Sequence, residues 1–481
     1  MKDTIIYFTI RLISGFIGLA SIYILTRILS PEEYGEFALL IAILTFVSGI
    51  GYQWLIISTS RLIVEHKTNL PTFFKAVISL FIVSSLFVAI LIFISTYIYP
   101  KMTEDYYFLL VSIAIILGIY NLLIHLANIS QKPFLYGSLS LSRSIVSLLA
   151  SVIFILYFNW SSIGAIFGFS IGFFISILLF IFYYQSTLLK LYYQIKKLPV
   201  MQDDQLVSTL FRYGIPLSFT YLALMLINVS DRLMLAKLGT TIDVAVYSAV
   251  YDLSQQTIGV LMNTLFLAYF PKIIYAYTNG LNKQLSNMTQ QLGTLMLIIG
   301  ILVSIIFTNA STGIANIMFG EGIAQPASQI IPIISIGMAI GFYKNFYLDI
   351  AFQVMKNTNM QFKLTAIMAG INILANVVLI PIFGSYGAAL STLIAFSLGA
   401  ILSYIYGNKI MPLFIFTHDS LKIFLSGILT FVLVYYFNFT YTSPIDTLVN
   451  IIILSSVFCL FLILFNISNI QRTLYTIIIR K

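Results

Sequence analysis

The chain has 481 residues, of which 60% are hydrophobic and 9% are charged. Soluble domains carry about 25% charged residues, so this composition excludes a soluble fold and indicates an integral membrane protein. The net charge of +9 would suit a nucleic-acid-binding protein. However, the lysines and arginines stand in short segments between apolar runs, which is a membrane pattern, so we expect no nucleic-acid partner.

A helix needs roughly 20 mainly apolar residues to cross the hydrocarbon core of a bilayer. The sequence predicts an all-α membrane fold with about fourteen such helices. Arg11 interrupts the first run, and no small-residue cleavage site follows it, so we predict a retained helix and not a signal peptide. The predicted spans are 5–29, 37–60, 74–98, 106–129, 141–158, 163–184, 212–235, 244–269, 291–308, 326–352, 361–381, 386–406, 421–439 and 447–467.

Basic residues are distributed unequally between the two sides of these spans. When the connecting segments are assigned alternately, 20 of the 25 lysines and arginines fall on the side of the N-terminus. Cytoplasmic loops are enriched in Lys and Arg, so we predict that both termini are cytoplasmic. The longest connection, at 185–211, is polar and basic, and it is predicted to be a cytoplasmic linker between two halves.

The two halves of the chain resemble each other. Segment 155–180 is similar to 378–403, since in each a short turn leads to Gly-Ala and a helix rich in small residues; 28–40 echoes 237–250 more weakly. Parallel repeats of six helices are a transporter architecture. The predicted organisation is an N-terminal six-helix lobe (1–184), the linker (185–211), a C-terminal six-helix lobe (212–410), and two extra helices with a cytoplasmic tail (411–481).

Ionisable residues inside spans are costly and usually face a cavity or a partner. Asp252 lies in the eighth span, and an α-helix would place Gln255, Gln256 and Asn263 on its face. We predict that Asp252 lines a cavity and is a candidate for coupling to an ion. The alternative is a buried carboxylate that only makes hydrogen bonds between helices.

Lys344 and Asp349 share the tenth span. Five residues apart on an α-helix, they would point roughly 140° from each other, so we expect no pairing within the helix. Lys344 is predicted to line the cavity. Asp349 is a second candidate for ion coupling, although it lies nearer the cytoplasmic end, where it could be solvated. Polar faces in the fourth and eleventh spans, the latter with Gln361 and Thr365, are more typical of helix packing.

Four arginines, Arg11, Arg61, Arg143 and Arg212, fall at or near the predicted cytoplasmic ends of spans 1, 2, 5 and 7. Anchoring in the cytoplasmic interface explains any one of them. Arginines from several helices at one depth can also surround a cavity mouth and hold a phosphate bidentately. Arg11, about six residues inside its predicted helix, is the hardest to explain by anchoring.

No catalytic constellation is present in the sequence. The histidines are far apart, Cys459 is the single cysteine, and there is no Gly-rich phosphate loop of the Walker type. We therefore expect no metal, no cofactor and no direct use of ATP.

Three segments resemble a known family. They are LTRILSPEEYGEFALLIAILTFVSGIGYQWLIISTSRLI (25–63), DRLMLAKLGTTIDVAVYSAVYDLSQ (231–255) and NILANVVLIPIFGSYGAALSTLIAF (372–396). They look like bacterial polysaccharide repeat-unit flippases of the O-antigen type, in the polysaccharide transporter branch of the multidrug/oligosaccharidyl-lipid/polysaccharide exporter superfamily. Arg11 and Arg61 match positions that are often basic in the family, and Asp231 and Arg232 match its second-lobe signature. Val246 departs from it, since a Gly often precedes the Tyr there.

The resemblance implies a non-enzymatic flippase in the bacterial inner membrane. Its substrate would be an undecaprenyl-diphosphate-linked oligosaccharide, with Arg11 and Arg61 on the pyrophosphate and Asp252 and Lys344 on sugar or a coupling ion. The implied partners are membrane lipids, H⁺ or Na⁺, a polysaccharide polymerase and a chain-length regulator.

Two alternatives stay open. One is an ion-coupled multidrug antiporter on the same fold, which favours acidic cavity residues. The other is a membrane-embedded polymerase or glycosyltransferase, for which only Glu32–Glu33 and Glu104–Asp105 offer outer carboxylates.

Overall fold

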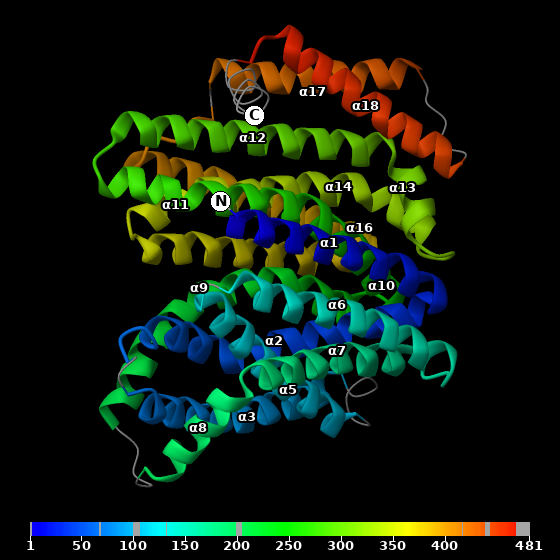
Figure 1. The fold of residues 1–481 in the computed structure, drawn as a ribbon. Helices are drawn as coiled ribbons and strands as arrows, with labels where there is room; N and C mark the ends of the chain where they lie inside the picture. The colour runs from blue at the N-terminus through cyan, green and yellow to red at the C-terminus, as the bar shows by residue number, and fades with distance from the viewer. Residues whose placement is uncertain are drawn as a thin grey trace. The chain divides into compact units, whose positions relative to one another are not determined.

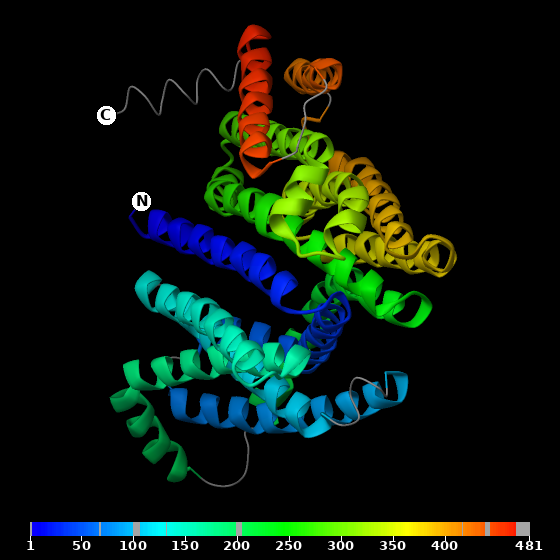
Figure 2. The same ribbon diagram turned by 90° about the vertical axis from the view of Figure 1, so that its right-hand side faces the viewer.

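The computed structural model describes residues 2–66, 69–99, 106–130, 132–198, 204–415, 417–437 and 443–467. Within these ranges the regular structure is helical and contains no strand, which confirms the predicted all-α fold (Figures 1 and 2). Glu104, Asp105 and the predicted tail after residue 467 lie outside the described residues.

The chain forms two compact units. Unit 1 comprises Met1–Ser21 and Ile28–Ala236, and unit 2 comprises Ile22–Arg27 and Lys237–Lys481. The predicted repeat lobes, with their boundary at the 185–211 linker, stay a prediction. Unit 1 contains most of α1 (Lys2–Ile28), α2 (Pro31–Leu62), α3 (Leu70–Ile98), α5 (Tyr107–Ile129), α6 (Pro133–Leu156), α7 (Ser161–Tyr183), α8 (Gln185–Lys196) and most of α9 (Asp204–Leu238).

The main part of unit 2 starts with helices α10 and α11, which are joined by the π-helical turn η2. Its elements are α10 (Thr241–Ser254), η2 (Gln255–Gly259), α11 (Val260–Thr278), α12 (Asn282–Asn309), α13 (Ser311–Met318), α14 (Ala324–Tyr343), η3 (Lys344–Leu348), α15 (Ile350–Val354), α16 (Thr358–Ile410), α17 (His418–Phe437) and α18 (Pro444–Leu464). The end of α1 belongs here because the Arg27 guanidinium donates to the carbonyl oxygens of the last turn of α13, at 2.7–3.2 Å.

Eleven helices among the described residues are long and apolar enough to cross a membrane, and the two arms of α9 would make a twelfth. The protein is therefore a multi-pass membrane protein, but the predicted number of fourteen spans is not confirmed. The break predicted near residue 160 is present between α6 and α7. The break predicted near residue 384 is also present, since α16 consists of two helices that meet at a kink, where Gly384 has non-helical backbone angles.

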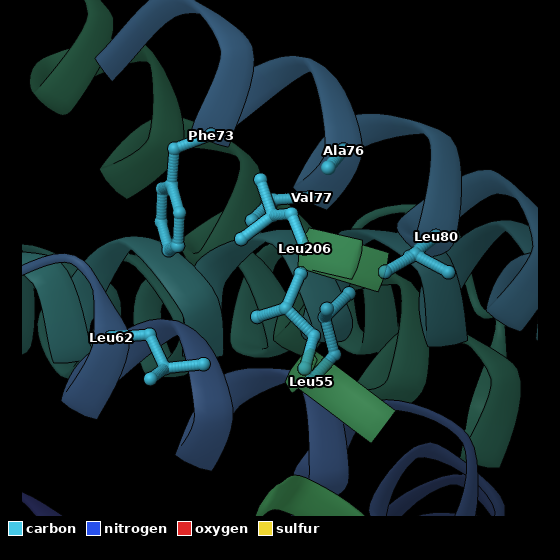
Figure 3. Packing of buried hydrophobic residues seen from close by; sticks show 8 residues of the cluster. Leu55, Leu62, Phe73, Ala76, Val77, Leu80 and Leu206 are labelled. Carbon is cyan, nitrogen blue, oxygen red and sulfur yellow. The ribbon is translucent and has the colours of Figure 1, made fainter. Parts of the chain in front are cut away.

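The core of unit 1 includes a cluster in which α2, α3 and α9 meet (Figure 3). Leucines of α2 and α9 pack against an apolar stripe of α3, which explains why the start of α9 belongs to this unit. The opposite face of α3 exposes large apolar side chains, as expected for a helix that contacts lipid. The buried cluster is Leu55, Leu62, Phe73, Ala76, Val77, Leu80, Leu206 and Leu210.

The two repeated sequence motifs take similar local structures. Ser30 caps α2 in a capping box with Glu33, and Thr240 caps α10 in a capping box with Asp243. In unit 2, Asp243 also accepts a hydrogen bond from the backbone N–H of Ser385, at 2.8 Å, next to the kink of α16. In unit 1 a different hydrogen bond joins the start of α2 to the start of α7, since the Ser162 hydroxyl donates to the carboxylate of Glu36 (2.9 Å), which is not the capping residue.

Candidate functional site

The predicted site residues are distributed over both units. The four arginines lie in unit 1, whereas Asp252, Lys344 and Asp349 lie in unit 2. Each unit therefore has its own set of charged side chains within apolar helices.

Arg143 lies deeper in its helix than the sequence predicts. The predicted span began at residue 141, but α6 begins at Pro133 because this proline at the first helical turn starts the helix earlier. Arg143 is thus ten residues from the helix start, or about 15 Å along the axis. The placement at a helix end is wrong, and anchoring in the interface does not explain an arginine at this depth.

The Arg143 guanidinium is held by aromatic rings and a hydroxyl. Its central carbon lies 5.2 Å from the ring centroid of Phe173 and 6.0 Å from that of Tyr120. These two rings, on α7 and α5, pack edge to face at 4.8 Å. One terminal nitrogen donates to Ser144 Oγ at 3.0 Å. Cation–π contacts orient a guanidinium without neutralising its charge.

No described carboxylate pairs with Arg143, and its Nε is buried without a hydrogen-bond partner among the described residues. Burial of an unpaired polar group is unfavourable, so this N–H favours a partner from outside the described residues. An N–H donor and a full positive charge are therefore available to an anion at the junction of α5, α6 and α7.

Arg11 lies on α1, a helix of unit 1 that contacts α6. Helix α1 packs on α6 through Ile10, which contacts Gly137, and through a hydrogen bond between Ser14 and Ser140 (3.3 Å). Arg11 is one turn before Ser14, and Arg143 is one turn after Ser140. Arg11, half-buried, makes no hydrogen bond or ion pair with a described residue. Since α1 and α6 run in the same direction at this contact, the two arginines lie on opposite sides of the Ser14–Ser140 hydrogen bond, about 9 Å apart along the helix axes.

Arg61 and Arg212 have more ordinary surroundings. Arg61, in the last turn of α2, forms an ion pair with Glu65 one turn later (3.5 Å), and both side chains are more than half exposed. Arg212 is exposed on α9. Exposed ion pairs contribute little because water screens them. Whether these two arginines contact substrate stays a prediction.

Lys344 and Asp349 form an ion pair, with 2.9 Å between Nζ and Oδ2. The expectation that they do not pair within their helix is wrong, because residues Lys344–Leu348 form a π-helix. A π-helical turn contains one more residue than an α-helical turn, so residues five apart come onto the same face. Both side chains are buried, with Lys344 0% and Asp349 1% exposed.

The ion pair is part of a hydrogen-bond network with α16. Lys344 Nζ donates to Thr365 Oγ1 (3.2 Å), and Ser403 Oγ donates to Asp349 Oδ1 (2.8 Å). Gln361 Nε2 also donates to Asp349 Oδ2 (3.4 Å). Gln361 and Thr365 precede the kink of α16 and Ser403 follows it, so the network links both arms of α16 to η3. Neither charge is left uncompensated.

The predicted polar stripe around Asp252 is also interrupted by a π-helix. Residues Gln255–Gly259 form η2, which shifts the register of everything after it by about one residue. Asn263 therefore does not share the α-helical face of Asp252. Asp252 is partly buried and interacts with other residues. Its predicted role in ion coupling stays a prediction.

Unit 2 contains an apolar cavity of about 870 Å³. Side chains of α11, α12, α14, α16 and α17 line it, including Met262, Met296, Ile336, Ala400 and Phe424. Residues on its α17 wall, such as Ile428 (58% exposed), also face outward. Tyr343 lines the cavity, and its hydroxyl is buried without a hydrogen-bond partner in the described part of the chain. The cavity suits a long hydrocarbon chain.

Sequence reasoning missed the groups that surround Arg143 and Lys344. Tyr120 and Phe173 are aromatic residues in apolar runs, where packing is the usual role, and no motif marks them as contacts of Arg143. Ser403 was also missed. The available signal was the recurrence of serines at one-turn spacing along α6, at positions 140 and 144, beside a lone arginine.

The sequence profile of a family described as "Polysaccharide biosynthesis protein" matches residues 1–275, more than half of the chain. The chain belongs to this family. An uncharacterized membrane protein of Methanocaldococcus jannaschii is 25% identical over 242 residues, which cover 49% of this chain and 46% of that protein. The match thus spans less than half of that relative's length.

Solved structures show the same fold. A lipid II flippase MurJ in an inward closed conformation superposes with a TM-score of 0.75 at 18% identity, over 95% of this chain and 98% of its own. An inward-facing multidrug resistance MATE family transporter of the MOP superfamily gives 0.64 at 15% identity, over 84% and 97%. The protein therefore has the same fold as this lipid II flippase and this multidrug transporter.

Proposed function

We propose that this protein is a flippase for an undecaprenyl-diphosphate-linked oligosaccharide, such as an O-antigen, capsule or exopolysaccharide repeat unit. It moves the head group from the cytoplasmic to the outer face of the bacterial inner membrane by alternating access. The observation that carries the proposal is Arg143, a guanidinium in mid-helix with no described carboxylate partner and a buried free N–H.

The chemistry of the head group matches this site. A sugar diphosphate cannot cross hydrocarbon bare, because each unsatisfied polar group costs several kcal/mol. A guanidinium presents parallel N–H donors that fit two phosphate oxygens and keeps its charge at any physiological pH. Arg143 would bind the diphosphate directly, with Arg11 as a second donor. Arg61 and Arg212 are more exposed, and they would attract the anion before it reaches Arg143 and Arg11.

Unit 2 has a surface whose chemistry suits the polyprenyl part of such a substrate. A polyprenyl chain needs an apolar groove that is open to the lipid. The 870 Å³ cavity has apolar walls, and some residues of its α17 wall are exposed on the outside of the unit. Membership of a polysaccharide biosynthesis family supports a saccharide as the cargo. Similarity to a lipid II flippase supports a lipid-linked one. A polymerase with its chain-length regulator would then use the product.

A multidrug antiporter would use a free acidic residue to bind cations. Asp349 is neutralised by Lys344, so it offers no free charge in the state described. Asp252 remains the proposed coupling residue for H⁺ or Na⁺, and Lys344 would act through its network without touching the sugar directly. The cationic residues of unit 1 favour an anionic substrate over a cationic drug.

The test is a flipping assay in proteoliposomes with a fluorescent polyprenyl-diphosphate disaccharide. Arg143→Ala should reduce the initial rate by about 10- to 100-fold, as expected for loss of a charged hydrogen bond. Arg143→Lys should recover part of the rate, because an ammonium keeps the charge but not the bidentate geometry. Full activity of Arg143→Ala at wild-type protein levels would contradict the proposal.

A further inference from the structure

The ammonium group of Lys344 occupies a position where a free cation would otherwise be expected. It lies fully buried between η3 and the first arm of α16, 2.9 Å from an oxygen of Asp349 and 3.2 Å from the hydroxyl oxygen of Thr365. Both contacts are oxygen atoms. An ammonium carries three N–H groups, and the described residues accept two of them.

A second layer of polar groups holds this site in place. Ser403 Oγ donates to Asp349 Oδ1 at 2.8 Å, and Gln361 Nε2 donates to Asp349 Oδ2 at 3.4 Å. The carboxylate is thus fixed from three directions by η3 and the two arms of α16. Such supporting hydrogen bonds orient an oxygen ligand toward a cation.

The same set of atoms is suited to a small monovalent metal ion. Hard cations take carboxylate, hydroxyl and amide oxygens as ligands. Without Lys344, Asp349 and Thr365 would keep two such ligands in position, and the Gln361 amide can turn to present its oxygen. The volume of the missing lysine side chain would admit an ion with water. The buried carboxylate also requires a positive charge, because an isolated one is strongly unfavourable in an apolar interior.

We propose that Lys344 is a tethered cation that fills a monovalent-cation site built by Asp349, Thr365, Gln361 and Ser403. The π-helix makes this arrangement possible, since it brings the ammonium of residue 344 onto the carboxylate of residue 349. The site is neutral without an ion from solution, so no ion is bound or released here during turnover. Removal of the lysine side chain uncovers the site for Na⁺ or a small alkylammonium ion.

The experiment uses the full-length protein, purified in detergent at one pH. The midpoint of thermal unfolding is measured in NaCl, methylammonium chloride and choline chloride of equal ionic strength. Choline is too large for the site and serves as the control for ionic strength. Lys344→Ala should unfold at a lower temperature than the wild type in choline, and Na⁺ or methylammonium should raise its midpoint by about 3 °C or more. The wild type should show no such difference.

The matched control is the uncharged pair Lys344→Met/Asp349→Asn, which removes both charges and leaves no reason to bind an ion. It should fold and respond equally to all three salts. The proposal is wrong if Lys344→Ala responds to the salts no more than this control does. It is also wrong if the double variant can be isolated while Lys344→Ala cannot be isolated in any of the salts, since no free cation then replaces the ammonium. Because the readout is ion-dependent stability, its failure is distinguishable from failure of the proposed flipping.

Discussion

Each unit of this protein contains a cation inside its apolar helices, and the two are treated in opposite ways. Arg143 of unit 1 has aromatic rings, one hydroxyl and no described carboxylate around it. The Nζ of Lys344 in unit 2 lies 2.9 Å from a carboxylate oxygen of Asp349 and donates to the Thr365 hydroxyl at 3.2 Å. The charge of Arg143 is available to a ligand, whereas the charge of Lys344 is neutralised by Asp349.

This difference separates a charge that serves binding from one that serves structure. A buried ion pair owes its stability to the presence of both members, so loss of one leaves the other uncompensated. A cation without a partner leaves nothing uncompensated when it is removed. We therefore expect charge removal in unit 2 to affect folding first, and charge removal in unit 1 to affect transport first.

The largest effect expected is that of Asp349→Asn on stability. The substitution leaves the ammonium of Lys344 buried without a counter-charge, which should lower the free energy of unfolding by about 3–5 kcal/mol. Arg143→Gln is the matched change in unit 1, and it should lower stability by less than about 1 kcal/mol. Thermal unfolding in detergent measures both. Equal losses of stability would remove the distinction between the two units.

The second prediction compares arginines within unit 1. Arg11→Ala should reduce the flipping rate by about 10-fold or more, because its half-buried guanidinium has no described partner and is available to the diphosphate. Arg61→Ala should reduce it by about 2- to 3-fold only, since Arg61 is exposed and paired with Glu65. The proteoliposome assay with the labelled disaccharide measures both rates. A larger loss for Arg61 than for Arg11 would move the binding site toward the end of α2.

The fold could be predicted from the sequence because a bilayer allows few alternatives. Long apolar runs must be helices there. The repeat of six helices, inferred from the similarity of 155–180 to 378–403, stays a prediction. The boundary of α6 could not be placed as well, since Gly137 and the serines that follow Pro133 weaken the apolar signal at its start.

The site was predicted less completely, because it depends on local backbone geometry. Residue spacing assigns Lys344 and Asp349 to different faces only if the helix is regular, and hydrophobic periodicity does not reveal a π-helical turn. The contacts of Arg143 with Tyr120 and Phe173 depend on packing among three helices, which no local pattern records.

A smaller effect on stability than that of Asp349→Asn is expected at the kink of α16, where the corresponding turns of the two units differ. Unit 2 uses Gly384, with φ 55° and ψ −131°, a conformation that is essentially restricted to glycine. A Cβ there would also lie only 2.5 Å from an oxygen of Asp243, the residue that joins the kink to α10. Unit 1 places Asn159 at φ 55°, without a glycine.

Gly384→Ala should therefore lower the free energy of unfolding by about 1–3 kcal/mol, from backbone strain and displacement of Asp243. Gly370→Ala provides the control, since it is the same change in the same helix, at a regular position with nothing within 4 Å of the new Cβ. There alanine should raise stability by up to about 1 kcal/mol, because it favours the helix more than glycine does. The midpoints of thermal unfolding in detergent should thus move in opposite directions. If Gly384→Ala is as stable as the wild type, the kink does not require glycine, and the turns of the two units are equivalent in their backbone demands.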